Sequence, residues 1–150
     1  MYTSKIALFV SLALATACSS SSPGTPATTP PPADDSGAAS TVTFTKVYTD
    51  IISPICVVCH NPAGVGVSVG KLDMSSQATA FSNLVGVAAG GAGCSGMGTR
   101  VVAGNAGSSI LYQKVTAPTC GSQMPLNGTP LTPDQADEIK GWISAGAMND

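Results

Sequence analysis

Apolar residues recur at helical spacing in residues 43–52, directly before the most distinctive stretch of the chain. Four of them share one face of an α-helix, at positions i, i+3, i+4 and i+7: Phe44, Val47, Tyr48 and Ile51. Pro54 follows, and a proline disfavours helical geometry in the residue before it. The pattern therefore predicts a first helix with one apolar face, ending before Pro54.

Two shorter helices are predicted in the middle of the chain. Residues 76–84 form the first, with an inward face made of Phe81, Leu84 and Val85. Residues 105–115 form the second, with Asn105 as the N-cap because its side-chain oxygen can accept a bond from a free backbone N–H. The inward face of this helix consists of Ile110, Leu111 and Tyr112. The glycine-rich stretches 61–71 and 88–98 are expected to be loops.

The last helix has the clearest start in the chain. Thr132 is the predicted N-cap, Pro133 takes the first helical position, and Gln135 completes a capping box. Its buried stripe consists of Ala136, Ile139, Trp142 and Ile143. Gly146 is the expected terminator. Residues 100–102 suggest a short extended piece, but no longer strand emerges, so the predicted fold class is all-α.

The N-terminus has the composition of an export signal. Lys5 supplies a positive charge, and residues 6–17 form an apolar run shorter than the about 20 residues that span a membrane. The run ends at Cys18 and resembles a bacterial lipoprotein signal, in which that cysteine carries the lipid. The alternative is an ordinary secretory signal, which leaves Cys18 as a spare thiol.

Composition divides the chain into three parts. Residues 1–17 are the predicted signal peptide, and residues 18–40 are a low-complexity tether of Ser, Pro and Thr that buries almost nothing. Residues 41–150 remain as one domain, long enough for a core of its own. The chain has six Lys and Arg against eight Asp and Glu, without a basic patch, so we expect no nucleic-acid partner.

The candidate chemistry follows the first helix, in the stretch Cys56-Val57-Val58-Cys59-His60. Two thiols separated by two residues and followed by histidine are the pattern of a c-type haem attachment site. The thiols bond to the two haem vinyl groups, and the imidazole binds the iron. His60 is the one histidine of the chain. We therefore expect one covalent haem c and its iron, held by Cys56, Cys59 and His60.

Three other interpretations of this stretch are chemically possible. A zinc site needs four ligands, and the remaining candidates, Cys94 and Cys120, are far apart in sequence. A thioredoxin-like redox pair needs a strand before it and a helix after it, whereas this pair follows a helix and a proline. A disulfide between Cys56 and Cys59 leaves His60 unexplained. Haem accounts for both cysteines and the histidine.

The cysteine count then assigns the remaining thiols. Cys18 is expected to carry lipid, and Cys56 and Cys59 to carry haem. Cys94 and Cys120 remain, and in an exported protein two remaining cysteines most simply form a disulfide. Such a bond stabilises a loop of this length by about 3 kcal/mol.

The order of these features resembles class I (mono-haem) cytochrome c domains: a helix leading into CVVCH, a Met124-Pro125 loop and a closing amphipathic helix. Three further stretches resemble the cytochrome c-like domains of bacterial envelope lipoproteins: LDMS at 72–75, RVVAGN at 100–105 and GWISAGA at 141–147. The resemblance covers about residues 42–147. It implies a small helical domain around the haem, with Met124 as the second axial ligand because it precedes the last helix.

The chain departs from that family in two places. Many members have a proline about a dozen residues after the histidine, whose carbonyl orients the imidazole, whereas this chain has glycine and leucine there and Pro62 is too close. The pair Cys94 and Cys120 is also absent from the general pattern. Met97 is the rival to Met124 as a ligand, and a loop methionine that only fills a gap is the remaining alternative.

The resemblance implies an electron carrier rather than an enzyme. With His60 and Met124 both bound, the iron has no open position, so its chemistry is a change between Fe(III) and Fe(II). We expect a redox partner protein in the cell envelope, in the periplasm or at the outer surface, and a membrane link through the lipid anchor. The alternatives are a haem enzyme or gas sensor with an open sixth position, and a partner-binding lipoprotein with a structural haem. We also expect a cleft between His60 and Met124.

Overall fold

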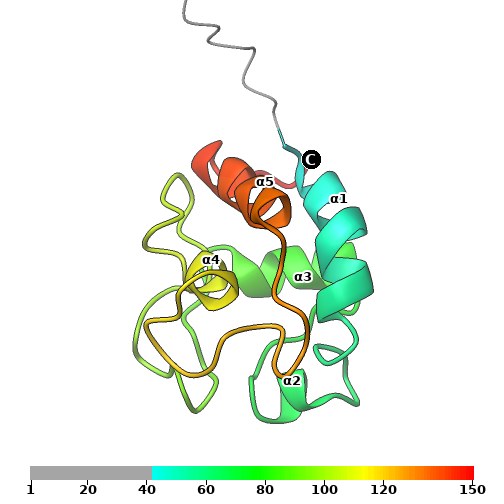
Figure 1. Ribbon diagram of the computed structural model, residues 1–150, viewed down its shortest axis with the longest axis vertical. Helices are drawn as coiled ribbons and strands as arrows, with labels where there is room; N and C mark the ends of the chain where they lie inside the picture. Colours follow the sequence, from blue (N-terminus) through cyan, green and yellow to red (C-terminus); the bar gives the residue numbers. More distant parts are fainter. Residues whose placement is uncertain (1–41) are drawn as a thin grey trace, which may run out of the picture. The chain divides into compact units, whose positions relative to one another are not determined.

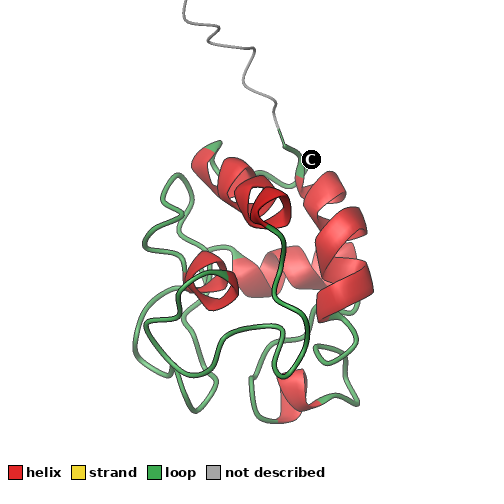
Figure 2. Cartoon of the chain, viewed as in Figure 1, coloured by secondary structure: helices red, strands yellow, loops and turns green. Residues whose placement is uncertain are grey.

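The computed structural model describes residues 42–150 as helices joined by loops (Figures 1 and 2). In chain order the helices are α1 (Phe44–Val47), the π-helix η1 (Tyr48–Cys56), α2 (Val65–Ser68), α3 (Gln77–Leu84), α4 (Ile110–Val115) and α5 (Pro133–Ser144). No strand forms within these residues, and the predicted extended piece at 100–102 takes part only in isolated bridges, such as Val85 with Val101. The all-α class is confirmed for this part of the chain. The predicted signal peptide, the tether and Cys18 lie outside the described residues.

The first predicted helix is present as α1 continued by η1 (Figure 1). Thr43 caps its start, because the Thr43 hydroxyl oxygen accepts the Lys46 N–H at 3.1 Å. Its predicted apolar face is confirmed: three of its members are fully buried and the fourth is half-buried, namely Phe44, Val47, Ile51 and Tyr48.

The predicted end of this helix before Pro54 is wrong. Pro54 lies inside η1, which continues to Cys56. In a π-helix an N–H bonds to the carbonyl five residues earlier, as Val57 does with Ile52 at 3.0 Å. In an α-helix a proline ring clashes with the carbonyl four residues earlier, and the wider turn of the π-helix departs from that pairing. The first thiol of the motif is therefore the last residue of the helix itself.

The last helix is formed as the sequence predicts. Thr132 accepts the Gln135 N–H, and the Gln135 side chain accepts the Thr132 N–H at 3.0 Å, so the capping box is complete. All four residues of the predicted stripe are buried: Ala136, Ile139, Trp142 and Ile143. After the C-cap residue Ala145, Gly146 takes a positive φ of 110°, which glycine adopts without strain. α5 packs against α1 and α4.

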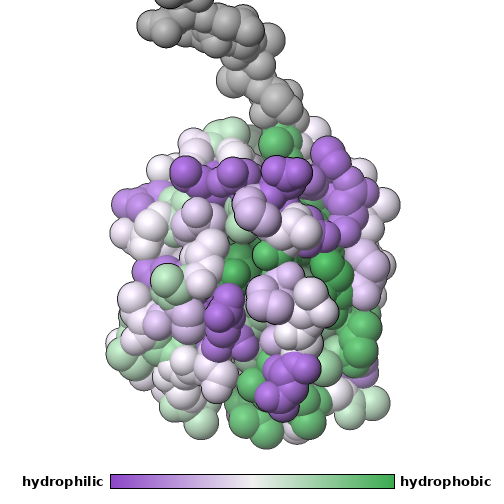
Figure 3. Space-filling model, viewed as in Figure 1, coloured by the Kyte–Doolittle hydropathy of each residue, from purple (hydrophilic) through white to green (hydrophobic). Residues whose placement is uncertain are grey.

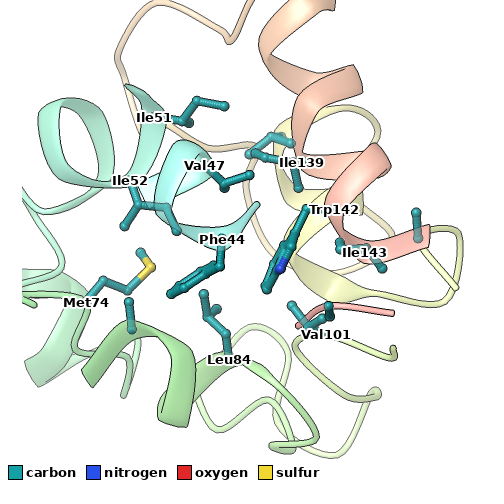
Figure 4. Packing of buried hydrophobic residues seen from close by; sticks show 14 residues of the cluster. Phe44, Val47, Ile51, Ile52, Met74, Leu84, Val101, Ile139, Trp142 and Ile143 are labelled. Atoms are coloured by element: carbon teal, nitrogen blue, oxygen red, sulfur yellow. The ribbon is translucent and has the colours of Figure 1, made fainter. Parts of the chain in front are cut away.

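The core lies where α1, η1, α3 and α5 meet, around Phe44 and Trp142 (Figure 4). The ring centroids of Phe44 and Trp142 are 4.8 Å apart, and Phe81 meets Phe44 edge-on at 5.3 Å. The C-terminal residues close this core, because Asp150 accepts the Phe44 N–H at 2.8 Å. The core is therefore built from both ends of the described chain.

One helix boundary and one loop in the middle of the chain differ from the prediction. α3 begins after Ser76 as expected, but α4 begins at Ile110, and Asn105 is not its N-cap. The Asn105 side chain instead accepts the Ser108 N–H at 3.0 Å in a local turn, a use that competes with helix capping. The expected loop at 61–71 contains the four-residue helix α2, which begins after Gly64. Both differences come from local turns that the glycine-rich composition concealed.

Candidate functional site

The Cys-x-x-Cys-His stretch folds back onto the end of η1. The Cys56 carbonyl accepts the Cys59 N–H at 3.2 Å and the His60 N–H at 2.9 Å. The two intervening residues therefore form a tight turn that brings the main chain of Cys59 and His60 back to the Cys56 carbonyl.

The two thiols of the motif are free and lie in different surroundings. Cys56 is half-buried and Cys59 is exposed, and neither forms a disulfide. Burial raises the pKa of the Cys56 thiol to about 11, so this group is protonated at neutral pH. Its Sγ lies 3.9 Å from the Ile51 carbonyl oxygen, within the helix. The alternative of a Cys56–Cys59 disulfide is not what the structure holds.

The imidazole of His60 is fixed through one ring nitrogen. Nδ1 lies 3.0 Å from the Leu72 carbonyl oxygen, so Nδ1 carries the proton and donates it to that oxygen. Nε2 is then the nitrogen with a free lone pair, which is the form that binds a metal. Gly66 lies against the ring, because a Cβ placed there would be 2.5 Å from His60 Cγ and Nδ1.

Leu72 stands twelve residues after His60, and its main-chain carbonyl is the group that fixes the imidazole. A carbonyl is common to every residue, so the Leu72 side chain gives no sequence signal for this role. The contact of Gly66 with the His60 ring was likewise not identified from the sequence.

An apolar cavity of about 450 Å³ opens beside the motif. Its walls come from the end of η1 with the following turn, from the loop before α5, and from the start of α5: Pro54, Ile55, Val58, Cys59, Pro125, Leu126, Gly128, Thr129, Pro130, Leu131, Thr132 and Gln135. In the space-filling view, apolar side chains come to the surface in the middle of the same face, whereas hydrophilic ones gather over α5 (Figure 3). The predicted cleft between His60 and Met124 is displaced, since the walls contain their neighbours Cys59 and Pro125 instead.

Met124 is held on α4 through its own main chain. Its N–H donates to the Lys114 carbonyl at 2.7 Å, and its side chain is half-buried. The Lys114 ammonium donates to the carbonyls of Cys120 at 3.0 Å and Ser122 at 2.7 Å, so one residue holds the loop at three points. Burial lowers the pKa of Lys114. Gly121 takes a positive φ of 56° here, which favours glycine, and a Cβ at this position would lie 2.7 Å from Lys114 Nζ. The role of Lys114 was not recognised from the sequence.

The remaining methionines fit a ligand role less well. Met97, the predicted rival, lies in the glycine-rich stretch 88–98 and is 59% exposed. Met74 is 2% exposed within the core. Met148 follows α5 and is 63% exposed. Among the methionines of residues 42–150, Met124 is thus the one that is neither enclosed in the core nor mostly exposed, and it adjoins Pro125 of the cavity wall.

The predicted cysteine pair lies against the same loop as Met124. Cys94 and Cys120 are joined, with their Cα atoms 5.2 Å apart. Both are buried, in a small second cluster with Ala89 and Ile110. Among residues 42–150 no group of three or more His, Cys, Asp and Glu side chains is placed to hold a metal ion.

None of the helices in residues 42–150 is both long and apolar enough to cross a membrane. Comparison with known proteins gave no match to any family model, curated protein or solved structure.

Proposed function

We propose that this chain is a mono-haem c-type cytochrome that carries single electrons in the cell envelope. The observation that carries the proposal is the fixed imidazole: His60 Nδ1 donates to Leu72 O within a Cys-x-x-Cys-His stretch, which leaves Nε2 for a metal. The residues present fit a haem, because the free thiol of Cys59 lines an apolar cavity and the Cys56 carbonyl ties Cys59 and His60 into one turn with the free thiol of Cys56. When bound there, the haem would supply a one-electron couple between Fe(III) and Fe(II).

The residues around the site support covalent attachment and exclusion of water. Cys56 and Cys59 are held in one turn by the Cys56 carbonyl and would form the two thioethers. Ile55, Val58 and Leu131 give the cavity apolar walls, which favour the less charged state of a bound redox centre. His60 cannot rotate freely, because Gly66 and Leu72 contact its ring.

Met124 is the residue we propose as the second axial ligand. Its support is its anchored main chain and its place beside Pro125, in the loop that forms one wall of the cavity. With both His60 and the Met124 thioether as ligands, a bound haem iron would have no open position for a substrate, so the proposed role is electron transfer and not catalysis. The partner is then a redox protein that meets the exposed apolar face of this site.

The proposed location follows from the N-terminal sequence and the cysteines. The predicted signal would export the chain, and lipid on Cys18 would link it to a membrane. The Cys94–Cys120 bond supports an oxidising compartment, where disulfides persist.

The test is a pyridine haemochrome spectrum combined with the mass of the exported protein. We expect one covalent haem per chain, and a mass that includes lipid on Cys18. The matched control is the double variant Cys56→Ala, Cys59→Ala, which should be exported without haem. A wild-type chain that is exported by a haem-maturing host and carries no covalent haem would overturn the proposal.

Met124→Ala tests the sixth ligand in the haem-loaded protein. We expect loss of the low-spin methionine spectrum and a lower reduction potential, because a thioether ligand favours Fe(II). Since Met124 is half-buried in a loop, the free energy of unfolding should fall by only about 1 kcal/mol. Met97→Ala is the control and should leave the spectrum unchanged. An unchanged spectrum and potential in Met124→Ala would show that the ligand is another group.

A further inference from the structure

The segment that orients His60 is held on both sides of Leu72. The Lys71 carbonyl accepts a bond from Arg100 Nη2, and the Asp73 carbonyl accepts the Asn83 side-chain N–H at 3.0 Å. Arg100 Nη1 also donates to the Asn83 carbonyl at 2.7 Å. Three successive carbonyls thus receive side-chain bonds, and the central one is that of Leu72, which accepts from the imidazole.

Arg100 is an unusual residue to find at this place. It is 8% exposed, and it forms no ion pair with an acidic side chain among residues 42–150. Its identified partners are the two main-chain carbonyls. Burying a cation is unfavourable unless its N–H groups are bonded, and an apolar residue of similar volume would fill the space at less expense. The charge therefore serves these two carbonyls and not the packing alone.

The backbone at Lys71 needs such a restraint. Its φ is 56°, a left-handed conformation that non-glycine residues adopt rarely and at some strain. Leu72 N–H donates to the Gly66 carbonyl at 3.0 Å, and Met74 N–H donates to the His60 carbonyl at 2.8 Å. A bond from Arg100 to the Lys71 carbonyl fixes the strained residue directly before the carbonyl that His60 uses.

We propose that Arg100, assisted by Asn83, is a positioning residue for His60. The guanidinium holds Lys71 and Asn83 together, Asn83 holds Asp73, and the Leu72 carbonyl between them is thereby aimed at His60 Nδ1. These bonds supply the rigidity that a proline would otherwise give at this position. The inference rests on the proposed function only where it explains why the His60 imidazole is oriented, namely to serve as a fixed ligand of the haem iron.

The experiment measures hydrogen exchange in the exported protein, by NMR, at His60 Nδ1–H and at the Leu72 and Met74 amides. In Arg100→Met we expect about tenfold faster exchange at Nδ1–H, because a lost charged hydrogen bond releases the Leu72 carbonyl. Val101→Ala is the matched control, since Val101 is a fully buried neighbour whose side chain only packs. This variant should lower the free energy of unfolding. Its Nδ1–H exchange rate should equal that of the wild type when the two proteins are compared under conditions well below their unfolding midpoints.

Two milder variants keep the proposal testable if Arg100→Met does not fold. Arg100→Lys keeps the charge but cannot reproduce the two-armed contact, so exchange should be accelerated severalfold. Asn83→Ala removes only the bond to Asp73, because Arg100 uses the Asn83 main chain, and its effect should be smaller. Wild-type Nδ1–H exchange in both variants overturns the inference. A chain without covalent haem contradicts the proposed function instead, and the exchange rates still report on Arg100.

Discussion

The two proposed axial ligands are held in different ways. His60 is tied to a segment that enters the core, since Leu72 accepts its Nδ1–H and Met74, two residues on, is 2% exposed. Met124 belongs to a loop in which no residue from 121 to 131 is buried. That loop is fixed from outside the core, by Lys114 on α4 and by the disulfide at Cys120.

This difference indicates which side of the site can yield. Loosening the His60 segment requires disturbing residues that share the core of α1, α3 and α5, so it is coupled to global unfolding. The Met124 loop can move after losing a few hydrogen bonds at the surface. Under the proposed function, an incoming ligand would therefore displace Met124 and leave His60 in place.

The largest effect is expected from Gly66→Ala, on the His60 side. The new Cβ would lie 2.5 Å from the His60 ring and 2.7 Å from the Cys59 carbonyl oxygen, and neither the ring nor the backbone has space to move. We expect the free energy of unfolding in urea to fall by more than the about 3 kcal/mol typical of overpacking, with poor haem attachment.

Gly107→Ala is the matched control for Gly66→Ala. Its Cβ would meet only the Asn105 side chain, at an ordinary contact distance of 3.7 Å. It should change stability by less than about 0.5 kcal/mol. Equal stability of the two alanine variants would contradict the tight packing of Gly66 on the imidazole.

Removing the disulfide is the next largest perturbation, on the Met124 side. In the double variant Cys94→Ala, Cys120→Ala we expect a loss of about 3 kcal/mol, because the unfolded chain gains freedom. Amide exchange measured well below the unfolding midpoint should become faster at Met124 than at Leu72 and Met74. Equal acceleration on both sides would show that the Met124 loop and the core are one cooperative unit.

The Cys56 thiol gives a pH-dependent prediction for the haem-free chain. Burial raises the pKa of Cys56 from 9.0 to about 11, so the unfolded chain loses this proton at lower pH than the folded chain. The corresponding stability is present below pH 9 and is lost as pH rises to about 11, by about 2 to 3 kcal/mol. Urea titrations at a series of pH values measure it.

Cys56→Ala is the reference for that titration. The difference in stability between the haem-free wild type and this variant should decline from pH 9 to pH 11, while other groups cancel. Haem attachment converts the thiol to a thioether, so the decline should also be absent from the loaded protein. A difference that stays constant over this range would show that Cys56 is more accessible to water than its place in η1 indicates.

The sequence predicted the two helices that frame the site more accurately than the loops that complete it. The stripe of α5 and the face of α1 follow from periodic side chains, and the Thr132 capping box has a local signature. Main-chain contacts have no such signature. Leu72 and Lys114 act through their carbonyl oxygens, and Pro54 is tolerated through a π-helix that propensity does not favour. The main-chain supports of the proposed site could therefore not be predicted from the sequence.

The smallest loss of stability is expected from Lys114→Met, and this variant distinguishes the Met124 side from the His60 side most clearly. This change removes the ammonium bonds to Cys120 and Ser122 and keeps the carbonyl that holds Met124 N–H. The free energy of unfolding should fall by only about 1 kcal/mol, because Met retains most of the apolar stem and the desolvation of the half-buried ammonium is relieved. Met124 amide exchange should nevertheless become about tenfold faster, with Leu72 unchanged.

Lys140→Met controls for loss of a positive charge, because Lys140 is exposed on α5 and makes no contact with the Met124 loop among the hydrogen bonds of the described residues. It should leave both exchange rates as in the wild type. In the haem-loaded protein, Lys114→Met should also bind added imidazole more tightly than Lys140→Met, since a freer loop surrenders Met124 more readily. Equal imidazole binding by the two variants, with different Met124 exchange rates, would show that the loop moves without releasing Met124 from the iron. The contacts of Lys114 would then not control how easily Met124 is displaced.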